Sequence, residues 1–265
     1  MSSGREGGVA IVAGFSLAEL LWSGRTLALA AVALLPTGLI LLFRAAAAAG
    51  IGMPFTAFGG FSLVTATVAF QFVVPLLALV YAGGLVAEEV EAGTLTYLIT
   101  RPRRRAALLG GKMLGSFALQ SALFLPSLVL SYYLALAPEG WRAVGEHFPD
   151  LGRDLLAGLL GLAAYSGIFT FAGAALRRPV LLGLGLVFGW EAWVTYIPGA
   201  LRRLTVAHYM LSLLPHEDFA GALGRFLGER SSTVRAALTL LLLAALFHGL
   251  ALWLFSRKEY SVRSG

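Results

Sequence analysis

Six long apolar segments constrain this chain more than any other feature of its sequence. They cover about residues 26–43, 61–87, 113–137, 155–176, 179–201 and 236–256. A helix of about 20 apolar residues crosses a bilayer, whereas the strands of membrane barrels alternate in hydrophobicity over about 10 residues. The segments are near the first length and continuously apolar. They predict an all-α integral membrane protein with six transmembrane helices.

The composition agrees with a membrane protein and argues against a water-soluble fold. Of the 265 residues, 58% are hydrophobic and 13% are charged, against roughly 45 to 50% and about 25% in soluble domains. Six crossings use roughly 120 residues. Without an internal repeat or a long low-complexity linker, residues 1–265 are expected to form a single transmembrane domain.

Lysine and arginine are distributed unevenly between the two expected faces, which predicts the orientation. An even number of spans places both termini on one side, and cytoplasmic loops carry the excess of Lys and Arg. The side with the termini has 12 of the 20 basic residues: Arg5, Arg25, Arg101, Arg103, Arg104, Arg105, Lys112, Arg177, Arg178, Arg257, Lys258 and Arg263. We therefore expect a multi-pass protein of the cell membrane with both termini in the cytoplasm.

The sequence lacks the motifs of several catalytic and binding classes. It contains no cysteine, which excludes disulfides and thiolate metal sites. Residues 110–112 are Gly-Gly-Lys, as at the end of a phosphate-binding loop, but the earlier glycine and the following hydroxyl residue of such a loop are missing. No histidine pattern fits a zinc protease. We predict no catalytic residue, metal or cofactor on this chain, and we assign the net charge of +6 to membrane orientation, with no nucleic-acid partner.

An N-terminal amphipathic helix is expected on the cytoplasmic surface of the membrane. Within residues 9–26 the polar residues Ser16, Glu19, Ser23 and Thr26 form one stripe on an otherwise apolar helix. Such a helix lies flat among the headgroups. A cytoplasmic extension of the first span is the alternative.

A second amphipathic helix is expected on the outer side, in the segment 202–235 between the fifth and sixth spans. Pro215 can open it, and its apolar face is formed by Phe219, Leu223, Phe226 and Leu227. This pattern predicts a short helix in the outer membrane interface.

The cytoplasmic connection between the second and third spans, residues 88–112, is the most informative stretch. Glu88, Glu89 and Glu91 end the second span, and Gly93 permits a turn. Thr94 can then cap a short helix. On that helix Leu95, Leu98 and Ile99 share one face, and Pro102 ends the element. A helix of about two turns is marginal alone, so these apolar side chains need a protein groove to bind.

This segment resembles the signature of type-2 ABC exporter permeases, the membrane subunits of ATP-binding-cassette transporters. The signature has acidic residues, then Glu-X-Gly-Thr-Leu, a further Leu, a Pro and a basic residue before the next span. The matching residues are Glu89, Glu91, Gly93, Thr94, Leu95, Leu98, Pro102, Arg105 and Lys112. The two amphipathic helices also look like this architecture, so the resemblance covers nearly the whole chain.

The resemblance implies a function for this loop and partners for the chain. It implies that the loop holds a coupling helix that sits in a cleft of a separate cytoplasmic ATPase subunit. The interface would comprise Glu88, Glu89, Glu91, Gly93, Thr94, Leu95, Leu98, Ile99, Pro102 and Arg105. Mg-ATP would bind to that partner, so this chain is expected to be a permease and not an enzyme. A second permease subunit, identical or related, would complete the pathway in the lipid bilayer.

Glu191 is the single charged residue within the six predicted spans. An acidic side chain at mid-membrane costs roughly 2.5 to 3.5 kcal/mol on insertion scales, so something must offset it. It is either part of the translocation path or a carboxyl hydrogen-bonded between helices, and the second interpretation is favoured. Trp190 and Trp193 are typical of membrane interfaces, so Glu191 alternatively faces an outer cavity beneath the last long loop.

Two other classes of function stay open from the residues alone. One is a secondary transporter or channel driven by an ion gradient, which usually has several ionisable residues within the membrane. The other is a membrane-assembly or immunity protein that transports nothing. The sequence does not identify the transported substrate.

Overall fold

The structure is a computed structural model that describes residues 24–52, 55–91, 102–176, 179–194, 197, 200–214 and 230–257. In these ranges the regular structure is helical. The helices are α2 (Gly24–Ala33), α3 (Leu35–Ala48), α4 (Ala57–Val64), η1 (Thr65–Val73), α5 (Val74–Glu91), α7 (Pro102–Leu136), η2 (Ala137–Glu139), α8 (Trp141–Glu146), α9 (Phe148–Ala175), α10 (Pro179–Leu184), η3 (Gly185–Glu191), α11 (Ala192–Val194), η4 (Ala200–Leu204), α12 (Val206–Leu213) and α14 (Thr233–Arg257).

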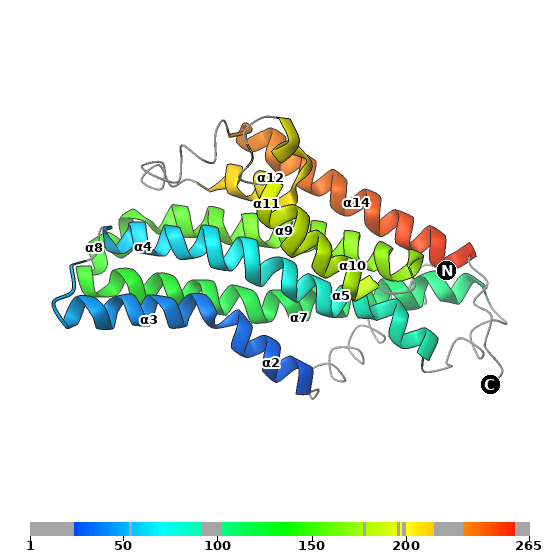
Figure 1. Ribbon diagram of the computed structural model, residues 1–265, viewed down its shortest axis with the longest axis horizontal. Helices are drawn as coiled ribbons and strands as arrows, with labels where there is room; N and C mark the ends of the chain where they lie inside the picture. The colour runs from blue at the N-terminus through cyan, green and yellow to red at the C-terminus, as the bar shows by residue number, and fades with distance from the viewer. Residues whose placement is uncertain are drawn as a thin grey trace, which may run out of the picture.

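The long helices form an elongated bundle with α9 at its centre (Figure 1). Helices α5, α7 and α14 all pack against α9, and α3 packs against α7. The short elements α11 and α12 lie above the long helices in this view, and α12 packs against α14. Large side chains fill the space between these helices, and the fully buried aromatic ones among the described residues are Phe61, Phe70, Phe124, Tyr132, Tyr165, Phe169 and Phe255.

Four of the described helices are long and apolar enough to cross a bilayer: Ala57–Leu85, Ala107–Glu139, Phe148–Ala175 and Thr233–Arg257. The pair α2 and α3 adds a fifth if its two bent halves count as one span. The prediction of an all-helical membrane protein is therefore confirmed, with four to five candidate spans. A further crossing over residues 179–201, which would bring the number to six, stays a prediction.

The first predicted span, residues 26–43, is bent in the structure by 41° between α2 and α3. Pro36 explains the bend, because proline has no N–H to donate to the preceding turn and its ring collides with that turn. The hydroxyl of Ser127 on α7 donates to the carbonyl oxygen of Ala33 beside the bend. Thr37 in turn donates to the carbonyl oxygen of Ser127, at 3.1 Å. Side chains of α7 thus supply hydrogen-bond partners next to the break.

The fifth predicted span, residues 179–201, is not one continuous helix. The apolar helical stretch covers Val180–Glu191, which is shorter than a full span, and Ile197 lies in a bend. From Gly185 the helix is wound as a π-helix, and glycines at 183, 185 and 189 weaken its helical preference. The prediction of a span over residues 179–201 relied on apolarity and did not take these glycines into account.

Glycines allow the helices of the bundle to approach closely. A Cβ atom on Gly158 of α9 would lie 2.3 Å from the ring of Phe124, and one on Gly183 would lie 2.2 Å from Leu79. The tightest constraint is at Gly173 of α9, where a Cβ would lie 2.8 Å from the backbone oxygen of Gly83 on α5. A backbone atom cannot move aside as a flexible side chain can, so α5 and α9 touch directly here.

Three predicted surface helices lie largely or wholly outside the described residues. Residues 1–23 contain most of the N-terminal amphipathic helix, residues 92–101 contain the expected coupling helix, and residues 215–229 contain the outer amphipathic helix. These three elements remain predictions.

Gly173→Ala should destabilise the protein, because the added methyl group collides with the backbone of α5. Overpacking of this kind typically costs about 1 to 3 kcal/mol. Gly152→Ala is the matched control on the same helix, since a Cβ there meets nothing within 4 Å. It should be neutral or slightly stabilising through helix propensity. Thermal unfolding of both purified variants in detergent measures the difference, and equal midpoints would contradict the backbone contact.

Candidate functional site

Five of the residues predicted to contact an ATPase subunit lie in described helices at one end of the bundle. Glu88, Glu89 and Glu91 occupy the last turns of α5, and Pro102 and Arg105 lie in the first turn of α7. The residues between them, Gly93, Thr94, Leu95, Leu98 and Ile99, are outside the described ranges. Because α5 packs against α7, both sides of this connection come from neighbouring helices. Pro102 begins a helix instead of only ending one, as suits its preference for a first helical position.

Glu191, the other predicted site residue, is buried at 6% exposure and accepts hydrogen bonds from three groups in the described part of the chain. The backbone N–H of Val206 donates to Oε1 at 2.9 Å. The N–H of Ala207 donates to Oε2 at 3.1 Å, and the hydroxyl of Tyr165 donates to the same oxygen at 2.8 Å. The side chain therefore joins three elements: η3, the start of α12 and the middle of α9.

The position of Glu191 at the start of α12 has an electrostatic reason. The first N–H groups of a helix have no partner within the helix, and they form its positive end. Val206 and Ala207 are the first two residues of α12, so the Glu191 carboxyl satisfies donors that burial would otherwise leave unpaired. The tryptophans on either side point elsewhere, since Trp190 is 40% and Trp193 is 73% exposed.

Helix α12 is held at both ends and along one side. At its start Thr205 is the N-cap, and its hydroxyl oxygen accepts from the N–H of His208. Near its end, Ser212 accepts from the N–H of Ser231 at 3.2 Å, immediately before α14. Along its side, Met210 packs on Gly161 of α9, where a Cβ would lie 2.3 Å from the Met210 sulfur. Helix α12 is thus a hydrogen-bonded bridge between η3 and α14.

His208 contributes to this bridge through its imidazole ring. Its Nε2 lies 3.1 Å from the hydroxyl oxygen of Ser231. Burial lowers the pKa of His208 below its ordinary value, and the positive charges of Arg202 and Arg203 lower it further. The imidazole therefore stays uncharged down to a lower pH than an exposed histidine does.

Sequence reasoning missed the buried carboxyl group of Asp154. It was placed just before the fourth span, but α9 begins at Phe148 and Asp154 is fully buried within it. Its spacing was the available signal, because Asp154 lies three residues after the buried Leu151 and four before the buried Gly158. In the part of the chain that the structure describes, no group of three His, Asp or Glu side chains converges to hold a metal ion.

Loss of the Glu191 carboxyl should destabilise the region around α12. Glu191→Leu leaves two backbone N–H groups and a phenol without their acceptor, at about 1 to 3 kcal/mol for each unsatisfied group. Glu191→Gln should be milder, because one amide oxygen still accepts. The NH₂ group of the glutamine cannot accept, so at least one of the three donors loses its acceptor. Both variants can be compared with wild type by thermal unfolding in detergent.

Glu146→Gln is the matched control, since this exposed glutamate pairs only with a neighbouring turn of its own short helix in the described structure. It should change stability by less than about 0.5 kcal/mol. A Gln variant at 191 that keeps wild-type stability and assembly, yet loses transport-coupled ATP hydrolysis, would show that the carboxyl works in the transport cycle and not mainly as a tether.

Comparison with known proteins gives one family. The sequence profile of the ABC-2 family transporter proteins matches residues 65–260. A relative is the probable ABC transporter permease protein NosY of Pseudomonas aeruginosa, which is 37% identical over 195 residues. That match covers 69% of this chain and 66% of the relative. The profile match covers well over half of the sequence, and the chain belongs to the ABC-2 transporter family.

Proposed function

We propose that this chain is the membrane permease subunit of an ABC-2 exporter and that ATP is hydrolysed on a separate subunit. In this function the chain provides the pathway and receives the movement of the ATPase at the α5–α7 connection. Family membership favours this over an ion-gradient-driven carrier or a non-transporting assembly protein. The observation that carries the assignment to this connection is the length and charge of the two helices that flank it.

Helix α7 is longer than a membrane crossing requires. Its 35 residues extend about 52 Å at 1.5 Å per residue, against about 30 Å of hydrocarbon. The excess belongs at the start of the helix, because Arg103, Arg104 and Arg105 are too costly to place in lipid. The first turns of α7 therefore project from the membrane, at the end of the helix that follows residues 92–101 in the sequence.

The charges on these helix ends oppose the helix dipoles. A helix is stabilised by acidic residues at its start and basic residues at its end. Here Glu88, Glu89 and Glu91 occupy the end of α5, and Arg103 to Arg105 occupy the start of α7. Each unfavourable placement costs typically about 0.3 to 1 kcal/mol at the surface. Local rules are commonly broken at functional sites, and an ATPase surface that recognises both charges would offset the cost.

The full architecture that we propose has six crossings and two cytoplasmic termini. The bent pair α2–α3 supplies the first crossing, and α10 with η3, within residues 179–201, supplies an incomplete fifth that packs against its neighbours. Helix α14 supports a dimeric arrangement, because only 17% of its most apolar window is buried within the chain. Its apolar outer face is available to lipid or to a second permease subunit.

Leu95→Asp and Leu98→Asp should weaken binding of the ATPase subunit without preventing membrane insertion. A charge in a desolvated apolar groove costs several kcal/mol, so co-purification of the ATPase should fall at least tenfold. The measurement is the ATPase-to-permease ratio after affinity purification of the tagged permease from detergent.

Thr100→Asp serves as the control for that experiment. In the expected helix, position 100 lies on the face away from Leu95, Leu98 and Ile99, so the same charge there should be tolerated. Equal retention of the ATPase in all three variants would remove the connection from the interface.

The proposed orientation can be tested by labelling single cysteines in this cysteine-free chain. Thr100→Cys should be inaccessible to an impermeant thiol reagent in intact cells, and Ser232→Cys should be labelled. Ser232 is chosen because it is exposed next to the start of α14, whereas Ser231 is hydrogen-bonded to His208. Permeabilised cells provide the control in which both positions react. Labelling at 100 but not at 232 in intact cells would invert the topology.

A further inference from the structure

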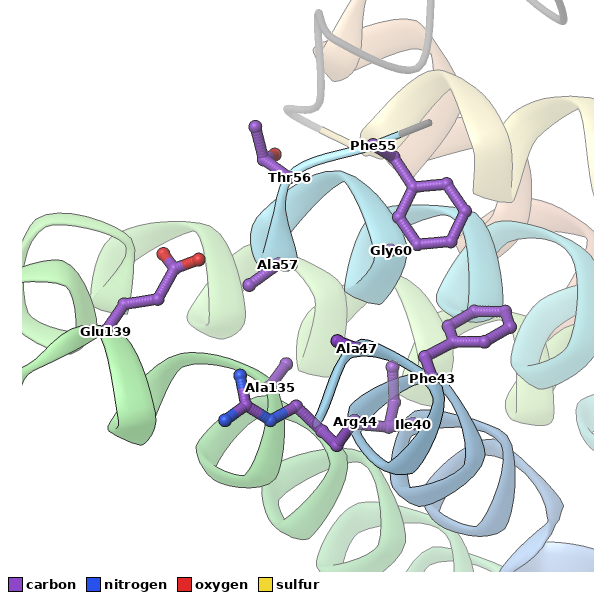
Figure 2. Close-up of a pocket in the computed structure, with 10 residues that line it drawn as sticks. All are labelled: Ile40, Phe43, Arg44, Ala47, Phe55, Thr56, Ala57, Gly60, Ala135 and Glu139. Atoms are coloured by element: carbon purple, nitrogen blue, oxygen red, sulfur yellow. The ribbon is translucent and has the colours of Figure 1, made fainter. Parts of the chain in front are cut away.

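A pocket lies at the end of the bundle opposite to the α5–α7 connection (Figure 2). It has a volume of about 240 Å³ and lies between the end of α3, the start of α4 and the end of α7 with η2. The three helices that form it are candidate membrane spans or half of a bent one. Their ends define a membrane surface, so the pocket lies at the depth of lipid headgroups.

One end of the pocket is aromatic. Phe43 of α3 and Phe55, which precedes α4, lie with ring centroids 5.1 Å apart. The hydroxyl oxygen of Thr56 accepts from the N–H of Gly59 and so fixes the start of α4. Gly60 leaves room for the Phe55 ring, since a Cβ at position 60 would lie 2.9 Å from that ring. The wall is therefore built by specific contacts and is apolar.

The other end of the pocket carries one positive and one negative side chain. Figure 2 shows Arg44 and Glu139 away from the two phenyl rings, with Ala135 near the Arg44 guanidinium. Arg44 is half-buried and Glu139 is exposed. Among the residues that the structure describes, neither side chain forms a hydrogen bond or ion pair. Two opposite charges near one cavity, not paired with each other, fit a ligand that carries both complementary charges.

The size of the pocket selects among such ligands. Sites for drug-sized molecules have volumes of about 300 to 1,000 Å³, so this pocket accommodates a headgroup and not a large cargo. Leu41 and Leu42 on α3 are 51% and 64% exposed. They offer an apolar surface outside the pocket along which acyl chains can lie. Guanidinium groups bind phosphate strongly, and a carboxylate accepts hydrogen bonds from a primary ammonium.

We propose that this pocket binds the headgroup of phosphatidylethanolamine, with its phosphate on Arg44 and its ammonium on Glu139. The paired charges disfavour a purely anionic headgroup, because Glu139 would repel it. A choline headgroup is also disfavoured, because its quaternary nitrogen has no hydrogen to donate to the carboxylate. The bound lipid is a structural ligand between α3, α4 and α7, and the proposal does not depend on the coupling function proposed above.

The test uses the full-length chain, purified in detergent with any subunits that accompany it. Native mass spectrometry measures binding of phosphatidylethanolamine, phosphatidylcholine and phosphatidylglycerol with identical acyl chains. Phosphatidylethanolamine should bind most tightly. Arg44→Gln should weaken its binding about tenfold, the effect of losing one charge-assisted hydrogen bond. Glu139→Gln should reduce it to the level of phosphatidylcholine and leave phosphatidylcholine binding unchanged.

Two further variants separate binding from folding and from general charge. Ala47→Trp fills the pocket from an exposed position and should abolish the preference while both charges remain. Arg142→Gln is the matched control, because its side chain is 92% exposed near the same end of the bundle, and it should bind lipid as wild type does. Thermal unfolding without added lipid checks that each variant is folded.

Three outcomes would overturn the proposal. The first is tighter or equal binding of phosphatidylglycerol or phosphatidylcholine by the wild-type chain. The second is unchanged affinity for phosphatidylethanolamine in both Arg44→Gln and Ala47→Trp. The third is an equal loss in the Arg142→Gln control, which would assign the effect to surface charge in general.

Discussion

Lipid offers the backbone no hydrogen-bond partner, and each unsatisfied group there costs several kcal/mol. A membrane helix can therefore break only where another part of the protein supplies the missing partner. Two breaks in this fold follow that constraint. Beside the bend at Pro36, the Ser127 hydroxyl donates to the carbonyl oxygen of Ala33. At the start of α12, the Glu191 carboxyl accepts from two backbone N–H groups.

These partners explain why some of the fold could be predicted and some could not. Continuous apolarity identified the helices over 57–91, 102–136, 148–175 and 233–257, because length in lipid is set by bilayer thickness. Pro36 was visible in the sequence, but its effect depends on α7. The fifth segment was predicted as a full crossing because nothing local shows that η3 and α12 share one carboxyl. Contacts between distant segments carry no periodic signal.

Some of the candidate site residues could likewise be predicted from the sequence, and others could not. The acidic and basic runs around residues 92–101 were readable, because a motif and its position between two spans are both local. Glu191 was readable as an exception to apolarity, although its partners were not. Asp154 was missed because the fourth span was predicted to start at residue 155, whereas α9 begins at Phe148. A charged residue just outside a predicted span is expected to lie in water and is not recognised as buried. Boundary errors of this size matter when a charged residue stands at the boundary.

The contact between Gly173 and the Gly83 carbonyl leaves no side chain between α5 and α9. Side chains between helices act as compliant spacers, since a rotamer change can absorb a small displacement. At this point no such spacer is present, so α5 and α9 are expected to move together as one rigid pair of helices. The acidic end of α5 is then fixed to the helix that carries Tyr165. A tilt of α5 that carries α9 with it therefore reaches the hydrogen bond between Tyr165 and Glu191, which can lengthen or break.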